Sequence, residues 1–158
     1  NNVMARQVLL SLAAQGTTAP ANHFRGAQII KTWLEEKGIS APELVIENGS
    51  GLSRSERIAP RTMGQMLISA YQSPLMPEFM SSMPLVGFDG TMRRRLTSAS
   101  IAGKAHIKTG RIDQVRSIAG YVFAASGKRY AVVCIVNHPN ADASQAAQDA
   151  MLQWVYEQ

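Results

Sequence analysis

The stretch AHIKTGRID, residues 105–113, stands where the sequence changes from a helical to a β-strand pattern. Short apolar runs separated by polar turns predict strands from here through the last third of the chain. The predicted strands cover residues 102–108, 116–126 (RSIAGYVFAAS) and 128–138 (KRYAVVCIVNH). A hairpin turn at Ser126-Gly127 joins the last two, so the sequence predicts an antiparallel three-strand meander.

The residues around this meander predict helices. Apolar spacing and bounding turn residues define five predicted helices, at residues 2–15, 24–37, 60–71, 76–83 and 143–156. Residues 44–46 predict a short strand, and residues 84–100 predict an irregular segment with a turn at Asp89-Gly90. Helices first, then a meander, then a covering helix predict an α+β fold, with residues 1–158 as a single domain portion.

The composition is that of a folded chain, because 46% of the 158 residues are hydrophobic and only 17% are charged. No apolar run reaches the roughly 18 residues that cross a bilayer, so no transmembrane segment is predicted. Because the chain begins with Asn1 rather than Met, we expect a cut or processed N-terminus. The one cysteine, Cys134, lies in an apolar run and is predicted to be a small buried strand residue.

Histidine positions and charge bear on possible ligands. His23, His106 and His138 are far apart, so the sequence predicts no metal site, and nothing in it indicates a cofactor. The net charge of +5 includes a basic run, MRRRL at residues 92–96. This run is either a solvated loop or a surface for an anionic polymer such as a cell-wall glycan. Few aromatic residues accompany it, which argues against nucleic acid.

The triplet Lys108-Thr109-Gly110 is the clearest chemical motif. Such a triplet, leading into further strands and a terminal amphipathic helix, is one of the marks of penicillin-recognising serine enzymes. These enzymes also carry a nucleophile in a Ser-x-x-Lys motif, and no serine here has a lysine three positions later. Ser50 and Ser53 are predicted to belong to a structural loop rather than to a nucleophile elbow. His106, two residues before Lys108, either lines the same site or is a packing histidine.

Four stretches, in this order along the chain, resemble one protein family. They are NNVMARQVLLSLA (1–13), IENGSGLSRSERIAP (46–60), MPLVGFDGTM (83–92) and KTGRIDQVRSIAGYV (108–122). Together they are similar to the C-terminal part of the D-alanyl-D-alanine carboxypeptidase/endopeptidases of the peptidase S13 family. These are class C, low-molecular-mass penicillin-binding proteins. The resemblance implies a serine β-lactamase/D,D-peptidase-like fold.

The resemblance also implies a function for the whole protein. It implies a bacterial periplasmic serine peptidase that is acylated by the D-Ala-D-Ala end of peptidoglycan stem peptides and trapped by β-lactams. In this family Ser-x-x-Lys lies far upstream, so we expect this chain to be a fragment that is inactive alone. We also expect the apolar edge of the last strand, around VVCIV (132–136), to pair with the missing N-terminal part or with another copy. The alternatives are a non-catalytic binding domain for an anionic cell-wall polymer and a class A β-lactamase-like hydrolase.

By the same resemblance, five residues are candidates for the site. Lys108 and Asn2 are implied to be catalytic: the lysine supplies a positive field, and the asparagine of the Ser-x-Asn motif holds the substrate's peptide carbonyl. Thr109, Gly110 and Arg111 are implied to bind substrate through a hydroxyl, an unobstructed strand and a cation. Arg111 departs from the family, in which many relatives have Ser or Thr. It either clamps the substrate carboxylate bidentately or points to solvent.

Overall fold

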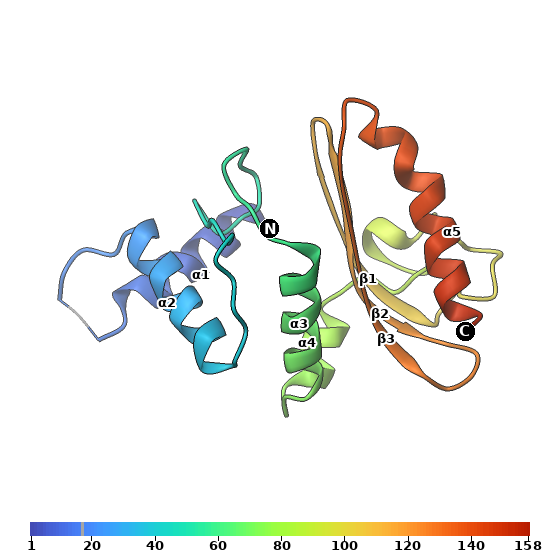
Figure 1. The fold of residues 1–158 in the computed structure, drawn as a ribbon, viewed down its shortest axis with the longest axis horizontal. Helices are drawn as coiled ribbons and strands as arrows, with labels where there is room; N and C mark the ends of the chain where they lie inside the picture. The colour runs from blue at the N-terminus through green and yellow to red at the C-terminus, as the bar shows by residue number, and fades with distance from the viewer. Residues whose placement is uncertain (17) are drawn as a thin grey trace. The chain divides into compact units, whose positions relative to one another are not determined.

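The structure, a computed structural model, describes residues 1–16 and 18–158. It divides into two compact units, Asn1–Thr62 and Met63–Gln158 (Figure 1). That residues 1–158 form a portion of one single domain stays a prediction. Over the described ranges, the structure has no helix that combines the length and the apolar character needed to cross a membrane.

The first unit is built on two helices, α1 (Asn2–Ala14) and α2 (His23–Glu36). They pack closely where α2 carries Gly26, since a Cβ there would lie 2.7 Å from the Leu9 carbonyl oxygen. Both helix starts are capped by asparagine. Asn1 Oδ1 accepts from the N–H groups of residues 3 and 4, and Asn22 Oδ1 accepts from the N–H of residue 25. The predicted strand at residues 44–46 is wrong, because the structure has only an isolated bridge between Val45 and Arg57.

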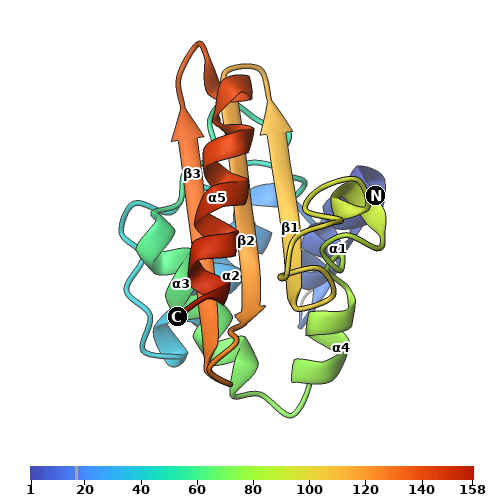
Figure 2. The same ribbon diagram turned by 90° about the vertical axis from the view of Figure 1, so that its right-hand side faces the viewer.

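The second unit is a three-layer arrangement around a sheet. The strands β1 (Ala105–Ile112), β2 (Val115–Phe123) and β3 (Arg129–Asn137) are antiparallel and lie in the order β1-β2-β3. Figures 1 and 2 show α5 (Gln145–Tyr156) along one face of this sheet, with α3 (Pro60–Tyr71) and α4 (Met76–Ser81) on the other. The predicted α+β fold with three antiparallel strands is confirmed.

Each face of the sheet has its own core. The α5 face buries a set of aliphatic side chains from β1, β2 and α5: Ile107, Ile118, Val122, Leu152 and Val155. Cys134 packs against this set and is only partly buried. The opposite face is centred on Tyr121, which packs with Leu67, Met80 and Met83. Its hydroxyl donates to the Leu67 carbonyl at 2.5 Å, so the polar end of this buried ring is satisfied.

The first strand differs from its prediction in a way that matters for the site. Residues 101–104 are turns, and β1 runs on to Ile112, so Lys-Thr-Gly lies inside the strand rather than at its end. The strand continues because Ile112 pairs with Val115 across a two-residue turn. Gln114 takes the left-handed conformation in this turn (φ +62°), where glycine or asparagine is usual, so the sequence carries no turn signal there.

The basic run at residues 92–96 is not simply a solvated loop. Arg93 and Arg94 are exposed, whereas Arg95 is buried. The Arg95 Nε and Nη2 groups donate to Asp149 Oδ1 of α5 at 2.9 and 2.7 Å. The predicted solvated loop is therefore wrong for Arg95, whose charge is committed to an ion pair within the fold.

Replacing Gly120 with alanine is expected to disrupt the pairing of β1 with β2. A Cβ at this position would lie 2.0 Å from the His106 carbonyl oxygen, which is a backbone atom of β1 and cannot rotate away. We expect Gly120→Ala to lower the free energy of unfolding by about 3 kcal/mol, measured by urea denaturation.

Gly64→Ala is the matched control, because a Cβ on that helical glycine meets nothing within 4 Å. It should be neutral or stabilising by up to about 1 kcal/mol. A Gly120→Ala protein as stable as the wild type would show that the described strand register is wrong.

Candidate functional site

The outer edge of β1 is open where the Lys-Thr-Gly triplet lies. Nearer the start of the strand, Ile107 N–H donates outward to the Pro84 carbonyl at 2.8 Å, and the Ala105 carbonyl accepts from Val86 N–H at 2.9 Å. Antiparallel pairing alternates, so Thr109 and Arg111 direct their backbone N–H and C=O groups to this same edge. Among the described residues, no strand pairs with them there. The edge can therefore accept another extended chain.

Side chains flank this open edge from opposite faces of the sheet. Lys108 lies opposite Ala119, on the face that α3 and α4 cover. Thr109 lies opposite Ile118, on the α5 face, and Arg111 follows on that face because side chains alternate along a strand. A chain bound along the edge would thus meet an ammonium group on one side and a hydroxyl and a guanidinium on the other.

Lys108 and His106 share a face but have different surroundings. Lys108 is exposed, and its ammonium donates to the carbonyl of the next residue, Thr109. His106 Nδ1 lies 3.3 Å from the Met83 carbonyl, and its ring meets the Phe123 ring edge-on at 6.3 Å between centroids. Of the two interpretations of His106, these contacts favour a packing histidine.

Thr109 is held by a residue that sequence reasoning did not single out. Its hydroxyl lies 2.8 Å from the hydroxyl of Thr91, in the 3-10 helix η1 (Gly90–Met92). The segment around η1 is a turn, as predicted, because Asp89 Oδ1 accepts from the Leu85 N–H at 2.7 Å. Thr91 reaches β1 only through folding of an irregular segment, so no spacing in the sequence could have indicated it.

Arg111 is bound to a carboxylate of the protein itself. Its Nη2 lies 2.5 Å from Asp142 Oδ2, in the 3-10 helix η2 (Ala141–Ser144). Hydrogen bonds from Arg111 and then Arg116 hold the pKa of Asp142 below its usual range. The Arg111 side chain is 64% exposed, but it is ion-paired and therefore does not point freely to solvent. The bidentate clamp of a substrate carboxylate by Arg111 stays a prediction.

Asn2 belongs to the other unit, where it is the first residue of α1. Its neighbour Asn1 caps the helix, so the exposed Asn2 amide is not used as the cap. The proximity of Asn2 to Lys108 stays a prediction. The Ser50 segment is a structural loop, as predicted: Ser50 bonds to Asn48 Oδ1, and Glu56 Oε1 accepts the N–H groups of residues 47–49.

Comparison with known proteins places these residues in a family. The D-Ala-D-Ala carboxypeptidase 3 (S13) family matches the sequence over residues 1–158. The chain belongs to this family. The predicted membership of the S13 family is confirmed, and the Lys-Thr-Gly strand is part of an S13 sequence rather than a chance triplet.

Individual relatives show how much of such a protein this chain represents. The D-alanyl-D-alanine carboxypeptidase DacB of Haemophilus influenzae is 30% identical over 139 residues, which are 87% of this chain and 29% of the relative. A D-alanyl-D-alanine carboxypeptidase of Actinomadura sp. is 28% identical over 156 residues, 96% of this chain and again 29% of the relative. The chain therefore spans less than a third of the length of these curated relatives.

Solved structures agree with the fold. The crystal structure of penicillin binding protein 4 (dacB) from Haemophilus influenzae superimposes with a TM-score of 0.84 at 25% identity, over 96% of this chain and 37% of that one. A structure of that protein complexed with a β-lactam has a TM-score of 0.80 at 24% identity and covers 96% and 39%. These likenesses confirm the predicted penicillin-binding-protein fold.

No metal centre accompanies the strand. Within residues 1–16 and 18–158, no three His, Cys, Asp or Glu side chains gather as metal ligands.

Gly110 lies close to a side chain of its neighbour on β2. A Cβ at Gly110 would lie 2.4 Å from Ser117 Oγ but 3.8 Å from Ser117 Cβ. We expect Gly110→Ala to lower the free energy of unfolding by about 1–2 kcal/mol, because the serine hydroxyl must leave its position.

The double variant Gly110→Ala/Ser117→Ala should regain most of that loss, and Ser117→Ala alone serves as the control. Urea denaturation of the three variants measures the coupling. If the double variant is as unstable as Gly110→Ala, the cross-strand contact is not the cause.

Proposed function

We propose that this chain forms one wall of the active site of a serine-type D-Ala-D-Ala carboxypeptidase/endopeptidase that acts on peptidoglycan and binds penicillin. One observation carries the proposal: in a chain of the S13 family, the Lys-Thr-Gly strand has an open edge from Thr109 to Arg111. The names of the matched relatives support the activity, and the β-lactam complex of the Haemophilus protein supports penicillin binding.

In the proposed complex, the end of a stem peptide lies along the open edge of β1. Backbone groups of Thr109 and Arg111 pair with it as an added strand would, once the Lys108 ammonium leaves the Thr109 carbonyl. The hydroxyl of Thr109 turns its hydrogen from Thr91 to the terminal carboxylate, and Lys108 supplies a positive field from the opposite face. An N–H of the same edge helps to stabilise the oxyanion that forms during acyl transfer. Gly110 leaves the strand surface free of a side chain.

The reacting serine is proposed to come from a polypeptide segment outside these 158 residues, since none of their serines stands in a Ser-x-x-Lys motif. Its oxygen attacks the penultimate D-Ala carbonyl, and the C–N bond to the terminal residue breaks. The leaving amine takes a proton, and water then hydrolyses the ester to restore the serine. Asn2 is proposed to hold the substrate's peptide carbonyl and to orient the lysines.

Two further elements belong to the same proposal. The outer edge of β3, which has no strand partner among the described residues, is proposed to pair with the segment that carries the serine or with another copy. The proposed location is the bacterial periplasm, where peptidoglycan stem peptides are accessible. The alternative of an anionic-polymer-binding domain has less support, because Arg95, one of the three arginines of the basic run, is already paired with Asp149.

Labelling with a fluorescent penicillin tests the proposal. The isolated 158-residue chain should not be labelled covalently, whereas a protein that joins it to its Ser-x-x-Lys segment should be. In that protein, Lys108→Ala should slow labelling by about 100-fold, the loss typical of removing one group that stabilises the transition state.

Lys104→Ala is the matched control, because Lys104 is also exposed and lies just before β1. Its labelling rate should equal that of the wild type. Covalent labelling of the isolated chain, or a normal labelling rate in the Lys108 variant, would contradict the proposal.

A further inference from the structure

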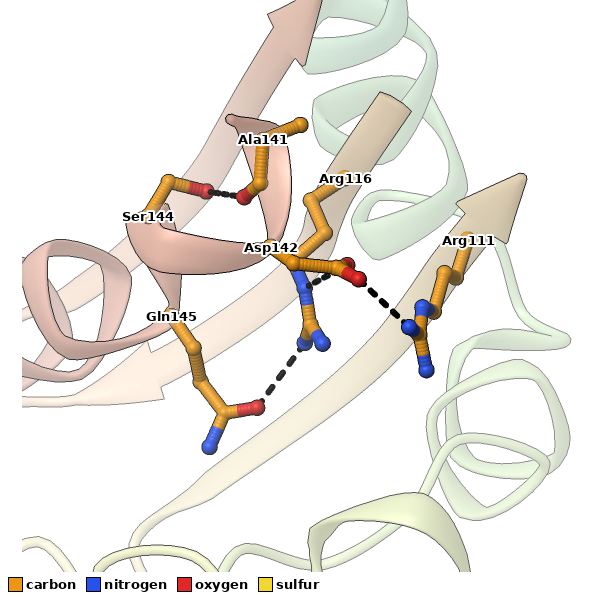
Figure 3. A network of polar contacts seen from close by, with 6 residues as sticks. All are labelled: Arg111, Arg116, Ala141, Asp142, Ser144 and Gln145. Carbon is orange, nitrogen blue, oxygen red and sulfur yellow. Dashed lines mark hydrogen bonds and ion pairs between the residues drawn. The ribbon is translucent and has the colours of Figure 1, made fainter. Parts of the chain in front are cut away.

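Asp142 joins two arginines that face each other across the first two strands. Arg111 of β1 and Arg116 of β2 are cross-strand partners, and two like charges directly opposite each other destabilise a strand pair. Figure 3 shows the Asp142 carboxylate between their guanidinium groups. Its Oδ2 lies 2.5 Å from Arg111 Nη2, and its Oδ1 lies 3.0 Å from Arg116 Nε. One carboxylate therefore lets both cations remain at the end of the Lys-Thr-Gly strand.

The contacts continue from Asp142 into the body of the protein. The Arg116 side chain is only 17% exposed, and its Nη1 donates to Gln145 Oε1 at 2.8 Å, at the start of α5. The turn that carries Asp142 is closed by Ser144, whose hydroxyl donates to the Ala141 carbonyl at 2.6 Å (Figure 3). Asp142 is thus fixed from the inner side and restrains the exposed Arg111 on the outer side.

While Asp142 holds Arg111, some N–H donors of its guanidinium remain available for a further anion. A guanidinium has five N–H donors, and Asp142 engages only the Nη2 group. The Nε and Nη1 groups of Arg111 have no acceptor among the described residues. Arg111 lies two residues beyond Thr109 on the same face, about 6.6 Å along the strand. The held guanidinium and the Thr109 hydroxyl therefore lie on the same face of the strand that carries the open edge.

We infer that Asp142 is a positioning residue that restrains the Arg111 guanidinium on the α5 face of β1, where its Nε and Nη1 groups are left to bind an anion beside the open edge, so that the site favours ligands carrying a carboxylate there over uncharged ones. This inference rests on the proposed function, since it needs a ligand along β1. The opposite effect is physically possible, because the charge of Asp142 also repels an anionic ligand. Positioning and repulsion predict opposite changes when Asp142 is removed, so an experiment separates them.

The test compares acylation by penicillin G and by its methyl ester, which lacks the carboxylate. Both rates are measured on the protein that carries the serine together with these residues, as wild type and as Asp142→Ala, Arg111→Ala and the double variant. We expect Asp142→Ala to lower the acid-to-ester rate ratio by about tenfold, the effect of one lost charge-assisted hydrogen bond.

The acid-to-ester ratio of the double variant should be no lower than that of Arg111→Ala, because the proposed effect of Asp142 on this ratio acts through Arg111, although Asp142 also pairs with Arg116. Asp142→Glu, which keeps the carboxylate, should recover part of the ratio. Arg94→Ala, which removes an exposed cation elsewhere in the same unit, should leave it unchanged.

An unchanged or increased ratio in Asp142→Ala overturns the inference while the proposed function stands. Additive losses in the double variant also overturn it. If neither compound acylates the wild-type protein, the proposed function itself fails. Thermal unfolding of each variant shows whether a lost rate is a lost fold, and a change in the acid-to-ester ratio cannot arise from unfolding alone, since unfolded protein lowers both rates equally.

Discussion

The close contact between the β1 and β2 backbones at Gly120 is the constraint on which the rest of the second unit depends. Because a Cβ there would overlap the His106 carbonyl oxygen, only glycine allows this register. The register decides which groups of β1 face outward. With Ile107 opposite Gly120, the backbone groups of Thr109 and Arg111 face the open edge, and their side chains lie on the α5 face.

The pairing of β1 with β2 fixes the groups that can bind a ligand, and it also brings two like charges together. Because side chains alternate along a strand, the Lys108 ammonium and the Thr109 hydroxyl lie on opposite faces and would flank a bound chain. The strand register also places Arg111 opposite Arg116, and the Asp142 carboxylate, which pairs with both arginines, offsets their repulsion. The ion pairs therefore follow from the strand pairing, and the binding preference that we infer for the edge follows from the ion pairs.

Much of this arrangement was predictable from sequence, because it depends on local periodicity. The helices, the meander and the Lys-Thr-Gly strand have strong patterns, and the family resemblance added the site residues. The end of β1 was misplaced because Gln114 occupies a turn position without the usual turn chemistry. Thr91 and Asp142 were missed because each meets β1 only through folding, 18 and 31 residues away from its partner in sequence. Asn2 remains assigned by resemblance alone.

The open edge of β1 is the central claim, and amide hydrogen exchange measured by NMR tests it most directly. In the free protein, the account predicts slow exchange for the Lys108 and Gly110 amides, which face β2, and fast exchange for Thr109 and Arg111. After acylation of the complete protein by penicillin G, at least one of the two fast amides should become protected. Protection of Thr109 and Arg111 already in the free protein, or no change at either after acylation, would contradict the account.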